Sequence, residues 1–395
     1  MDAGQQQGEG KRPLSILQMS TESCTQMVFV LPIARHLRAQ GHQVVLACSE
    51  DTGEAGKSFV GDLRAEGFEV LILPIKRTIS PWSDFRAVVE LYRHLRRRRF
   101  DVVHTQTAKA GMIGRIAGFL ARVPRVVYTA HAFPFHELLP RWQVAVYAFL
   151  ERSASPLCDA IAVDSACVRD RGLAFKVAPP DKIRVIPMGI DTDRFDPARH
   201  AQEGAPLRAE LGIDPKATLI GAIARFVDDK GLDELIQAVA LLAPKHPDLR
   251  CLLVGDGPLN EALRALVQEL GLEGKVIFAG FRTDIPRVLS ALDLFVLPTR
   301  REGFGVAFAE AMSMEVPVVG LHIPPMDELI VDGEVGALAE DGSAEAFARA
   351  MEPLLGDPAL RHRLGVAARQ RVVAHFGQSV MCRDYEGLFL GGPKS

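Results

Sequence analysis

The chain alternates short runs of apolar residues with longer stretches in which apolar residues recur every three or four positions. Runs of that length suit buried strands, and the longer stretches have the period of amphipathic helices. Strands that alternate with helices form parallel βαβ units, so the sequence predicts an α/β fold. The predicted strands are residues 14–19, 43–48, 69–75, 101–105, 125–130, 160–165 and 183–188 in the first half, and 218–224, 250–255, 275–280, 294–298 and 317–321 in the second.

The helical period is clear in residues 84–95, where one predicted face carries Phe85, Val88, Val89, Tyr92 and Leu95. Because the two halves repeat one scheme in 395 residues, we expect two domains. The stretch 187–206 is rich in Pro, Gly and charge, as linkers are. We therefore predict an N-terminal domain over 1–188, a linker over 189–206 and a C-terminal domain over 207–376.

Open parallel sheets bind ligands beyond the carboxyl ends of their strands. Two such domains that face one another imply a cleft between them, and closure about a hinge is expected. Candidate chemistry is therefore sought in the residues that directly follow the predicted strands.

Composition excludes several classes of protein. No apolar run approaches the ~20 residues of a membrane span, and the polar N-terminal stretch lacks the apolar segment of a signal peptide. The six cysteines are scattered without a CxxC pair, which favours reduced thiols over a disulfide framework or a zinc site. The expected location is cytoplasmic.

Charge is distributed unevenly along the chain. Residues 1–188 contain 25 Lys and Arg against 18 Asp and Glu, a net +7, and the remainder carries −10. The basic half indicates an anionic partner, such as a phosphate-bearing acceptor or an acidic membrane surface. Much of this charge lies in the run 93–100, which a solvated helix end would explain equally well. Nucleic acid is not expected, because no aromatic residues are interleaved with the basic ones.

Three stretches follow predicted strands of the first half. Residues 21–24 (Thr-Glu-Ser-Cys) offer hydroxyl and backbone N–H groups, Ser23 among them, but lack the glycine-rich turn of a nucleotide site. Lys109 stands near a helix start that is followed by glycines suited to close packing at 111, 114 and 118. His131 ends another strand beside aromatic residues, where it could be structural, bind a sugar hydroxyl or carry a proton.

In the second half, Arg225 and Lys230 flank the turn between a strand and a helix, where two cations suit a diphosphate. The alternative is a surface Arg and Lys beside acidic neighbours. A tight loop at 255–258, which begins at Gly255, lets a ligand approach the backbone. Phe281 and Arg282, after Gly280, are candidates for lining a base pocket.

Two acidic pairs require a decision. Asp191 and Asp193 have the spacing of a metal-binding pair but lie in the linker, and no metal is expected. Glu302 and Glu310 flank a Gly-Phe-Gly turn. A glycosidase would place two carboxylates ~5–10 Å apart across the scissile bond. Here the first is expected in a loop and the second in the following helix, so we expect them to hold separate parts of one ligand.

Together these motifs resemble the retaining glycosyltransferases of family 4 (glycosyltransferase group 1), which have the GT-B fold of two Rossmann-like domains. The resemblance covers nearly the whole chain, and the stretch 104–118 followed by 128–133 is similar to the subgroup that builds capsule, exopolysaccharide and O-antigen repeats. It implies a C-terminal helix, about 377–395, that returns to the N-terminal domain. The motifs that carry it are IPMGIDTDRF (186–195), IARFVDDKG (223–231), LLVGDGP (252–258), FAGFRTDIP (278–286) and REGFGVAFAEAMSMEVPVV (301–319).

The resemblance also implies roles for individual residues. Arg225 and Lys230 would bind the donor's diphosphate, and Glu310 would hold the ribose hydroxyls. Glu302, with the backbone of Gly303, Phe304 and Gly305, would hold the donor sugar and β-phosphate. His131 would contact the sugar or assist catalysis. Ser23 and Lys109 are the candidates for acceptor contacts.

The chain departs from the family pattern at several positions. Residues 21–24 replace paired glycines, Gln106 stands where a histidine is frequent, and Ala132 where glycine is common. Glu315 occupies a turn that usually holds a small residue. None of these changes removes a residue central to the donor site.

The implied reaction is metal-independent and cofactor-free transfer of a hexosyl or N-acetylhexosaminyl group, with a nucleotide-sugar, UDP-linked in the commonest case, as co-substrate. A lipid-linked or polysaccharide intermediate at the inner membrane face is the first expectation for the acceptor, and a soluble small molecule the second. Two alternatives share the architecture: a sugar-nucleotide 2-epimerase, and a partner protein that binds the donor without transferring it.

Overall fold

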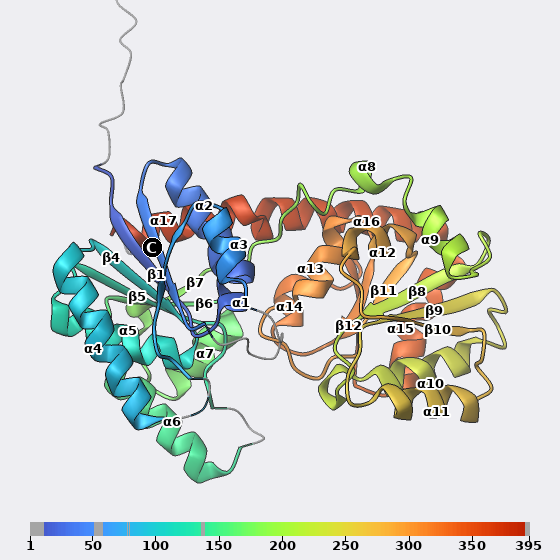
Figure 1. Cartoon of the computed structure of the whole chain (residues 1–395). Coiled ribbons are helices and arrows are strands. Elements are labelled where there is room, and N and C mark those ends of the chain that lie inside the picture. The colour runs from blue at the N-terminus through green and yellow to red at the C-terminus, as the bar shows by residue number, and fades with distance from the viewer. Residues whose placement is uncertain (1–11, 51–57, 77, 79, 136–138, 392–395) are drawn as a thin grey trace, which may run out of the picture. The chain divides into compact units, whose positions relative to one another are not determined.

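The structure, a computed structural model, describes residues 12–50, 58–76, 78, 80–135 and 139–391 (Figure 1). The chain forms two compact units. The first comprises the residues up to Asp164, Val168–Ile186 and the residues from Cys382 onward; the second comprises Ser165–Cys167 and Pro187–Met381. The stretch 189–206 therefore groups with the second unit.

A seven-stranded parallel sheet forms the centre of the first unit, in the order β3-β2-β1-β4-β5-β6-β7. All seven strands were predicted. The residues of β4 and β6 are buried throughout, as expected of a parallel sheet covered on both faces. The strands are β1 (Ser15–Met19), β2 (Gln43–Cys48), β3 (Glu69–Ile72), β4 (Val102–Gln106), β5 (Arg125–Ala130), β6 (Ala160–Val163) and β7 (Ile183–Val185).

The second unit contains a six-stranded parallel sheet in the order β10-β9-β8-β11-β12-β13. Five of its strands were predicted; β13 was missed because its sequence, Gly-Ala-Leu-Ala, lacks the β-branched residues typical of strands. In both sheets the first strand is central, as in a Rossmann fold, so the predicted fold class is confirmed. The strands are β8 (Thr218–Ile223), β9 (Leu249–Val254), β10 (Val276–Gly280), β11 (Leu294–Val296), β12 (Val318–Leu321) and β13 (Gly336–Ala339).

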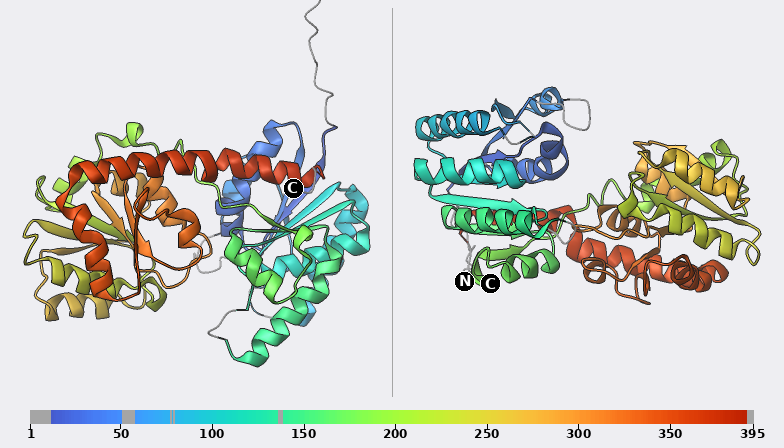
Figure 2. Two further views of the ribbon diagram at one scale, coloured as in Figure 1. Left: turned by 180° about the vertical axis from the view of Figure 1, so that it is seen from behind. Right: turned by 90° about the horizontal axis from the view of Figure 1, so that it is seen from below.

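Helices cover both faces of each sheet (Figures 1 and 2). Those that follow β1 to β6 are α1 (Ser23–Thr25), α2 (Leu31–Ala39), α3 (Val60–Ala65), α4 (Pro81–Arg98), α5 (Ala108–Ala121), α6 (Arg141–Ala154) and α7 (Ala166–Ala174). The later ones are α8 (Pro197–His200), α9 (Gly204–Glu210), α10 (Leu232–Leu242), α11 (Asn260–Glu269), α12 (Ile285–Ala291), α13 (Val306–Ser313), α14 (Met326–Leu329), α15 (Ala344–Gly356), α16 (Pro358–Arg371) and α17 (Gln378–Phe389).

The glycines of α5 allow this helix to lie close against the sheet, as predicted. A Cβ atom at Gly111 would come within 2.3 Å of the Tyr128 ring, and one at Gly114 within 2.1 Å of Thr105 Cγ2. Gly118 packs in the same way against Val126. These glycines therefore serve packing.

The predicted buried face of α4 is confirmed at Val88, Tyr92 and Leu95, which pack against the core, and is wrong at Phe85. Phe85 is 59% exposed, whereas Ala87, Leu91 and Leu95 are buried against the sheet. The aromatic ring of Phe85 instead stacks with that of Trp82 on the outer side of the helix, with ring centroids 6.0 Å apart. The run 93–100 forms the end of α4, which confirms that it is a helix terminus.

The last helix, α17, returns to the first unit from Cys382 onward, as predicted. Its Tyr385 hydroxyl lies 3.0 Å from Thr129 Oγ1 of β5, and the Tyr385 ring lies 5.1 Å from that of His104. Residues 392–395 of the predicted helix lie outside the described residues. None of the described helices combines the length and the apolar character that crossing a membrane requires.

Candidate functional site

The loops that follow β8 and β9 are joined backbone to backbone at the carboxyl edge of the second sheet. Phe226 N donates to Asp256 O at 2.9 Å, and Ala224 N to Val254 O at 3.0 Å. Gly255 has φ +136°, and a Cβ there would lie 1.9 Å from Ala224 O. Only glycine permits this approach, so the tight loop predicted at 255–258 positions the loop that carries the predicted diphosphate-binding residues.

Lys230 lies at the end of a short 3₁₀ turn, just before α10. Its Nζ is 2.6 Å from Glu302 Oε1 and 3.5 Å from Thr299 Oγ1. Gly231 follows in the left-handed region with φ +62°, and a Cβ there would be 2.3 Å from Pro298 O. The loops after β8 and β11 thus pack tightly, and the structure brings Lys230 and Glu302 together.

Glu302 lies in the loop after β11 and Glu310 lies within α13, which confirms the placement predicted for the pair. Gly305, with φ +95°, is the N-cap of α13, and a Cβ there would meet Met326 Cε at 2.5 Å. Phe304 is buried against Phe376, with ring centroids 5.4 Å apart, and this contact anchors the turn from the inside.

Glu310 differs electrostatically from Glu302. Its carboxyl group makes no hydrogen bond or ion pair with any residue in the described part of the chain. Burial raises the pKa of this carboxyl group and the Arg194 guanidinium lowers it; burial has the larger effect, and the resulting pKa is about 7. A half-buried carboxyl group without a hydrogen-bond partner is costly to ionise, and such groups cluster at functional sites.

The remaining predicted residues of the second unit have different surroundings. Arg225 is exposed in the loop after β8, and Phe281, 78% exposed, directly follows β10. Arg282 is bound by carboxylates: its guanidinium donates to Asp284 Oδ1 at 2.9 Å and to Glu210 Oε1 at 2.9 Å. These contacts raise the pKa of Arg282 and engage its donors within the protein.

In the first unit, His131 lies between two polar side chains. Its Nδ1 is 2.9 Å from Asp164 Oδ2, and its Nε2 is 3.0 Å from Gln106 Oε1. Burial alone lowers the pKa of His131, but the Asp164 carboxylate raises it, and the net shift is upward. The Phe29 ring lies 4.6 Å from the imidazole. The histidine is therefore fixed in orientation and held towards its charged form.

Ser23 and Lys109 are both engaged within the first unit. Ser23 is buried and its Oγ accepts a hydrogen bond from Phe59 N at 3.0 Å. The ammonium group of Lys109 donates to the Lys76 carbonyl at 2.6 Å and lies 2.9 Å from Asp84. Their roles in acceptor binding stay predictions.

Sequence reasoning missed two residues of these clusters. Asp164 directly follows β6, and His131 directly follows the neighbouring strand β5. The adjacency of these two strands could have revealed the contact between Asp164 and His131. Thr299 is fully buried, and its hydroxyl can donate its one proton to Asp229 O at 3.2 Å or to Arg301 O at 3.1 Å. Asp191 Oδ1 accepts a backbone hydrogen bond from Arg194 N at 2.9 Å, so it stabilises a turn.

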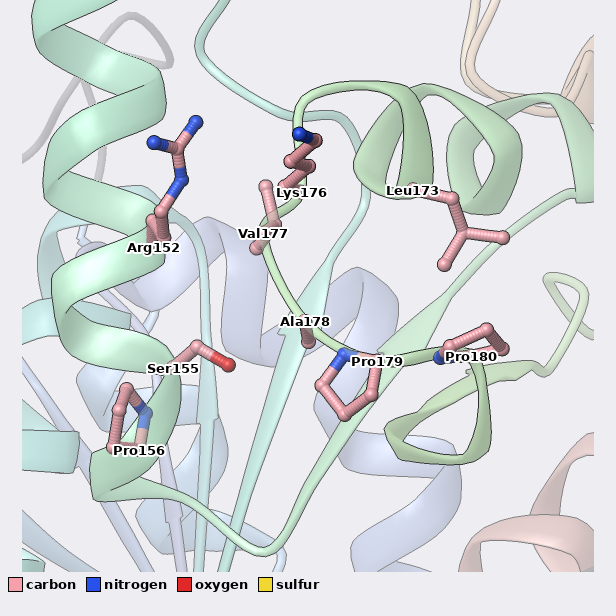
Figure 3. A pocket seen from close by; sticks show the side chains of 9 residues that line it. All are labelled: Arg152, Ser155, Pro156, Leu173, Lys176, Val177, Ala178, Pro179 and Pro180. Carbon is pink, nitrogen blue, oxygen red and sulfur yellow. The ribbon is translucent and has the colours of Figure 1, made fainter.

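A surface hollow in the first unit lies between α6 and the loop after α7 (Figure 3). It is lined by Arg152, Ser155, Pro156, Leu173, Lys176, Val177, Ala178, Pro179 and Pro180. None of the sequence-predicted site residues is among them. Over the described ranges, no group of three or more His, Cys, Asp or Glu side chains could hold a metal ion.

Comparison with known proteins identifies what this arrangement is similar to. A family model described as "Glycosyl transferases group 1" matches residues 205–371, and one described as "Glycosyltransferase Family 4" matches residues 27–194. The UDP-Gal:alpha-D-GlcNAc-diphosphoundecaprenol alpha-1,3-galactosyltransferase of Escherichia coli is 31% identical over 291 residues, which cover 72% of this chain and 74% of that protein. The capsular polysaccharide biosynthesis glycosyltransferase CapM of Staphylococcus aureus is 26% identical over 80% of this chain and 84% of its own.

Among solved structures, Anabaena HepE in complex with UDP has a TM-score of 0.82 and 22% identity. The match covers 96% of this chain and 100% of HepE. At this identity the likeness concerns the fold, which is the GT-B fold of two Rossmann-like units.

Proposed function

The chain belongs to the group 1 glycosyltransferases of family 4, and we propose that it moves a sugar from a UDP-sugar to an acceptor hydroxyl with retention of configuration. The observation that carries the proposal is the cluster at the carboxyl edge of the second sheet. There, Lys230 forms an ion pair with Glu302. In α13, the helix that follows Glu302, the carboxyl group of Glu310 has no hydrogen-bond or ion-pair partner among the described residues.

This cluster suits a nucleotide-diphosphate sugar. Arg225 and Lys230 supply positive charge for the diphosphate, and the N-terminus of α13 after Gly305 adds backbone N–H groups. Glu310 would accept hydrogen bonds from the ribose hydroxyls, and Glu302 would hold the donor sugar. UDP is the proposed nucleotide because the Escherichia coli relative is named for UDP-Gal and the HepE structure contains UDP.

In the proposed reaction, the bond between the anomeric carbon and the β-phosphate oxygen breaks, and its electron pair leaves with the phosphate. The acceptor oxygen bonds to the anomeric carbon on the same face, and its proton passes to a departing phosphate oxygen. Arg225 and Lys230 stabilise the negative charge that accumulates on this leaving group. No metal is required in this scheme, because the two cations supply the counter-charge.

His131 is proposed to serve the transfer step from the first unit. Asp164 on Nδ1 fixes the ring and favours its charged form, in which Nε2 also carries a proton. In the proposed complex a sugar hydroxyl takes the place of Gln106 Oε1, which lies 3.0 Å from Nε2, and accepts this hydrogen bond. Asp164 therefore acts as a positioning residue.

The proposed acceptor is a sugar carried on a lipid diphosphate, as in the name of the Escherichia coli relative. The basic character of residues 1–188 supports an acceptor that bears phosphate. Transfer to a soluble molecule is the alternative outcome of the experiment below.

The proposal is tested by thermal unfolding against a panel of UDP-, GDP- and ADP-sugars, followed by transfer assays with lipid-linked and soluble acceptors. A UDP-sugar at 100 times its Kd should add about 2.7 kcal/mol to the free energy of unfolding. Magnetic resonance of the product should show the donor's anomeric configuration. An inverted product would exclude the mechanism, full turnover of UDP-N-acetylglucosamine without acceptor would indicate an epimerase, and tight binding without transfer would indicate a non-catalytic protein.

A further inference from the structure

Large apolar side chains are exposed on three neighbouring helices of the first unit. Helices α4, α5 and α6 lie side by side and cover one face of the seven-stranded sheet (Figure 2). Their outward surface, called here the α4–α6 face, exposes Trp82, Phe85, Phe119, Leu120, Trp142, Val146, Phe149 and Leu150, each at least 43% exposed. Apolar clusters of this kind on a protein surface mark sites of interaction.

The same face is strongly basic. Nine arginines in the segments 81–99, 108–122 and 141–154 are exposed, whereas none of the three acidic residues in these segments is. Each acidic residue is already paired within the unit: Asp84 with Lys109, Glu90 with Arg86 and Glu151 with Arg115.

The arginines of α4 share the outer side of the helix with the aromatic residues. At 100° per residue, Trp82, Phe85 and Val89 point the same way as Arg93 and Arg96. Arg93, Arg96 and Arg97 are exposed, and none has an ion pair among the residues that the structure describes. The helix therefore presents aromatic rings near its first turn and unpaired positive charge along its last turns.

These features select one kind of partner. Tryptophan and phenylalanine are favoured at the boundary between lipid headgroups and acyl chains, and arginines beside them attract anionic headgroups. A second copy of the chain, paired about a two-fold axis, would bring these arginines together and be repelled. Nucleic acid offers no apolar surface for Val146 and Leu150.

We propose that the α4–α6 face docks the protein on an anionic lipid bilayer. A hollow at the carboxyl ends of β2 and β3 has Lys76 and Arg86 in its lining, together with Glu50 and Glu90. It adjoins this face, because Arg86 and Glu90 belong to α4. Lys109, one of the two predicted acceptor residues, donates to the Lys76 carbonyl, so docking would bring a lipid-anchored phosphate near Lys109. The proposal goes beyond the proposed function, because binding to lipid does not require sugar transfer.

The chain offers a direct probe, since its two tryptophans, Trp82 and Trp142, both lie on this face and are 73% and 66% exposed. We expect the intrinsic fluorescence of the full-length protein to shift to shorter wavelength with vesicles of equimolar phosphatidylcholine and phosphatidylglycerol. The protein should sediment with these vesicles, far less with phosphatidylcholine alone, and less as salt is added.

Charge reversal tests the electrostatic part. Each basic residue near an anionic surface strengthens binding about fivefold, so Arg93→Glu with Arg97→Glu should weaken vesicle binding at least about 25-fold. Arg363→Glu, at an exposed position of α16 in the second unit, is the matched control and should bind as the wild type does.

Removal of aromatic rings tests the apolar part. Phe85→Ser with Phe149→Ser should weaken binding about tenfold or more, whereas Leu241→Ser, at an apolar position of α10 that is 48% exposed, should not. Circular dichroism and thermal unfolding establish that each variant is folded.

Three results would overturn the proposal: no association with anionic vesicles, equal association with neutral ones, or binding that survives the Arg93 and Arg97 reversals. A fluorescence shift that grows with protein concentration in the absence of lipid, together with a dimer in sedimentation, would instead assign the face to self-association. Sugar transfer to a soluble acceptor is measured separately. A protein that does not bind lipid can therefore be distinguished from one that does not transfer sugar.

Discussion

The carboxyl edges of the two sheets have similar architecture but different chemistry. At the second sheet, glycines at 231 and 255 let backbone approach backbone, and Gly305 leaves room for the Met326 side chain. Glu310 has no hydrogen-bond or ion-pair partner among the described residues. At the first sheet, His131 lies between two polar partners, and Ser23 is bonded internally. The edge of the second sheet thus leaves a carboxyl group without a hydrogen-bond partner, which suits the proposed contact with ribose hydroxyls, whereas the first sheet holds its polar groups in an internal network.

The difference coincides with the positions at which the sequence departs from the pattern that the resemblance implied. The departures at residues 21–24, Gln106 and Ala132 all lie at the edge of the first sheet. The cations and carboxylates of the second sheet stand in the motifs that carry the resemblance. A nucleotide diphosphate is common to many donors, whereas acceptors vary, so this division fits a donor-binding second unit and an acceptor-binding first unit.

The largest expected effect is that of Lys230→Ala. Loss of a cation that stabilises the leaving phosphate should lower kcat about 100- to 1000-fold, and it also leaves Glu302 without its partner. Steady-state kinetics of sugar transfer measure this loss. Lys245→Ala, which removes an exposed ion pair with Glu352 in the same unit, should have no effect. If the kcat of Lys230→Ala stayed within tenfold of the wild-type value, the cluster in the second unit would take no part in the reaction.

The next effect concerns Glu310 and pH. The pKa of its carboxyl group is about 7, and the ionised form is the better acceptor for ribose hydroxyls. Affinity for a UDP-sugar, whose diphosphate does not titrate in this range, should therefore rise about tenfold between about pH 6 and pH 8. Calorimetric titration measures it.

The stability of the ligand-free protein should change with pH in the opposite direction to the affinity for the donor. Because the folded pKa lies above the ordinary value of 4.5, the ligand-free protein should lose stability as pH rises from 4.5 towards 7. Glu310→Gln should flatten both the affinity and the stability profiles. Identical profiles in this variant and the wild type would contradict the assignment.

Asp164→Asn tests the first unit. Removing the carboxylate should lower the pKa of His131, which nuclear magnetic resonance of the imidazole ring can follow. Because Asp164 holds the pKa of His131 above 6.5, its stabilising effect is full below pH 6.5 and fades as pH rises through the folded value.

The pH profile of transfer should shift to lower pH with the pKa of His131. Asp170→Asn removes an exposed carboxylate that pairs with Arg169, and it should leave the imidazole titration unchanged. If the pKa of His131 were unchanged in Asp164→Asn, the Asp164 carboxylate would not be what raises it.

The two sheets also differ in what could be predicted. All seven strands of the first sheet were found because their apolar runs are rich in Val and Ile, whereas β13 consists of small residues and was missed. The proximity of Lys230 and Glu302 follows from parallel topology, which brings loops after neighbouring strands to one edge. The bonds of Lys109 to Asp84 and to the Lys76 carbonyl could not be predicted, because they depend on how α5 packs against α4.

The smallest expected effect concerns Glu315, the departure from the family pattern in the second unit. It lies in the turn between α13 and β12 with φ +59°, a conformation that costs a non-glycine residue about 1 kcal/mol. Its ion pair with Arg369 is long, at 4.0 Å, and adds little. Glu315→Gly should therefore raise the free energy of unfolding by up to about 1 kcal/mol, measured by urea denaturation, and leave sugar transfer unchanged. Glu315→Ala removes the same charge but keeps the backbone cost, so equal gains in both variants would show that charge, and not φ, limits stability at this turn.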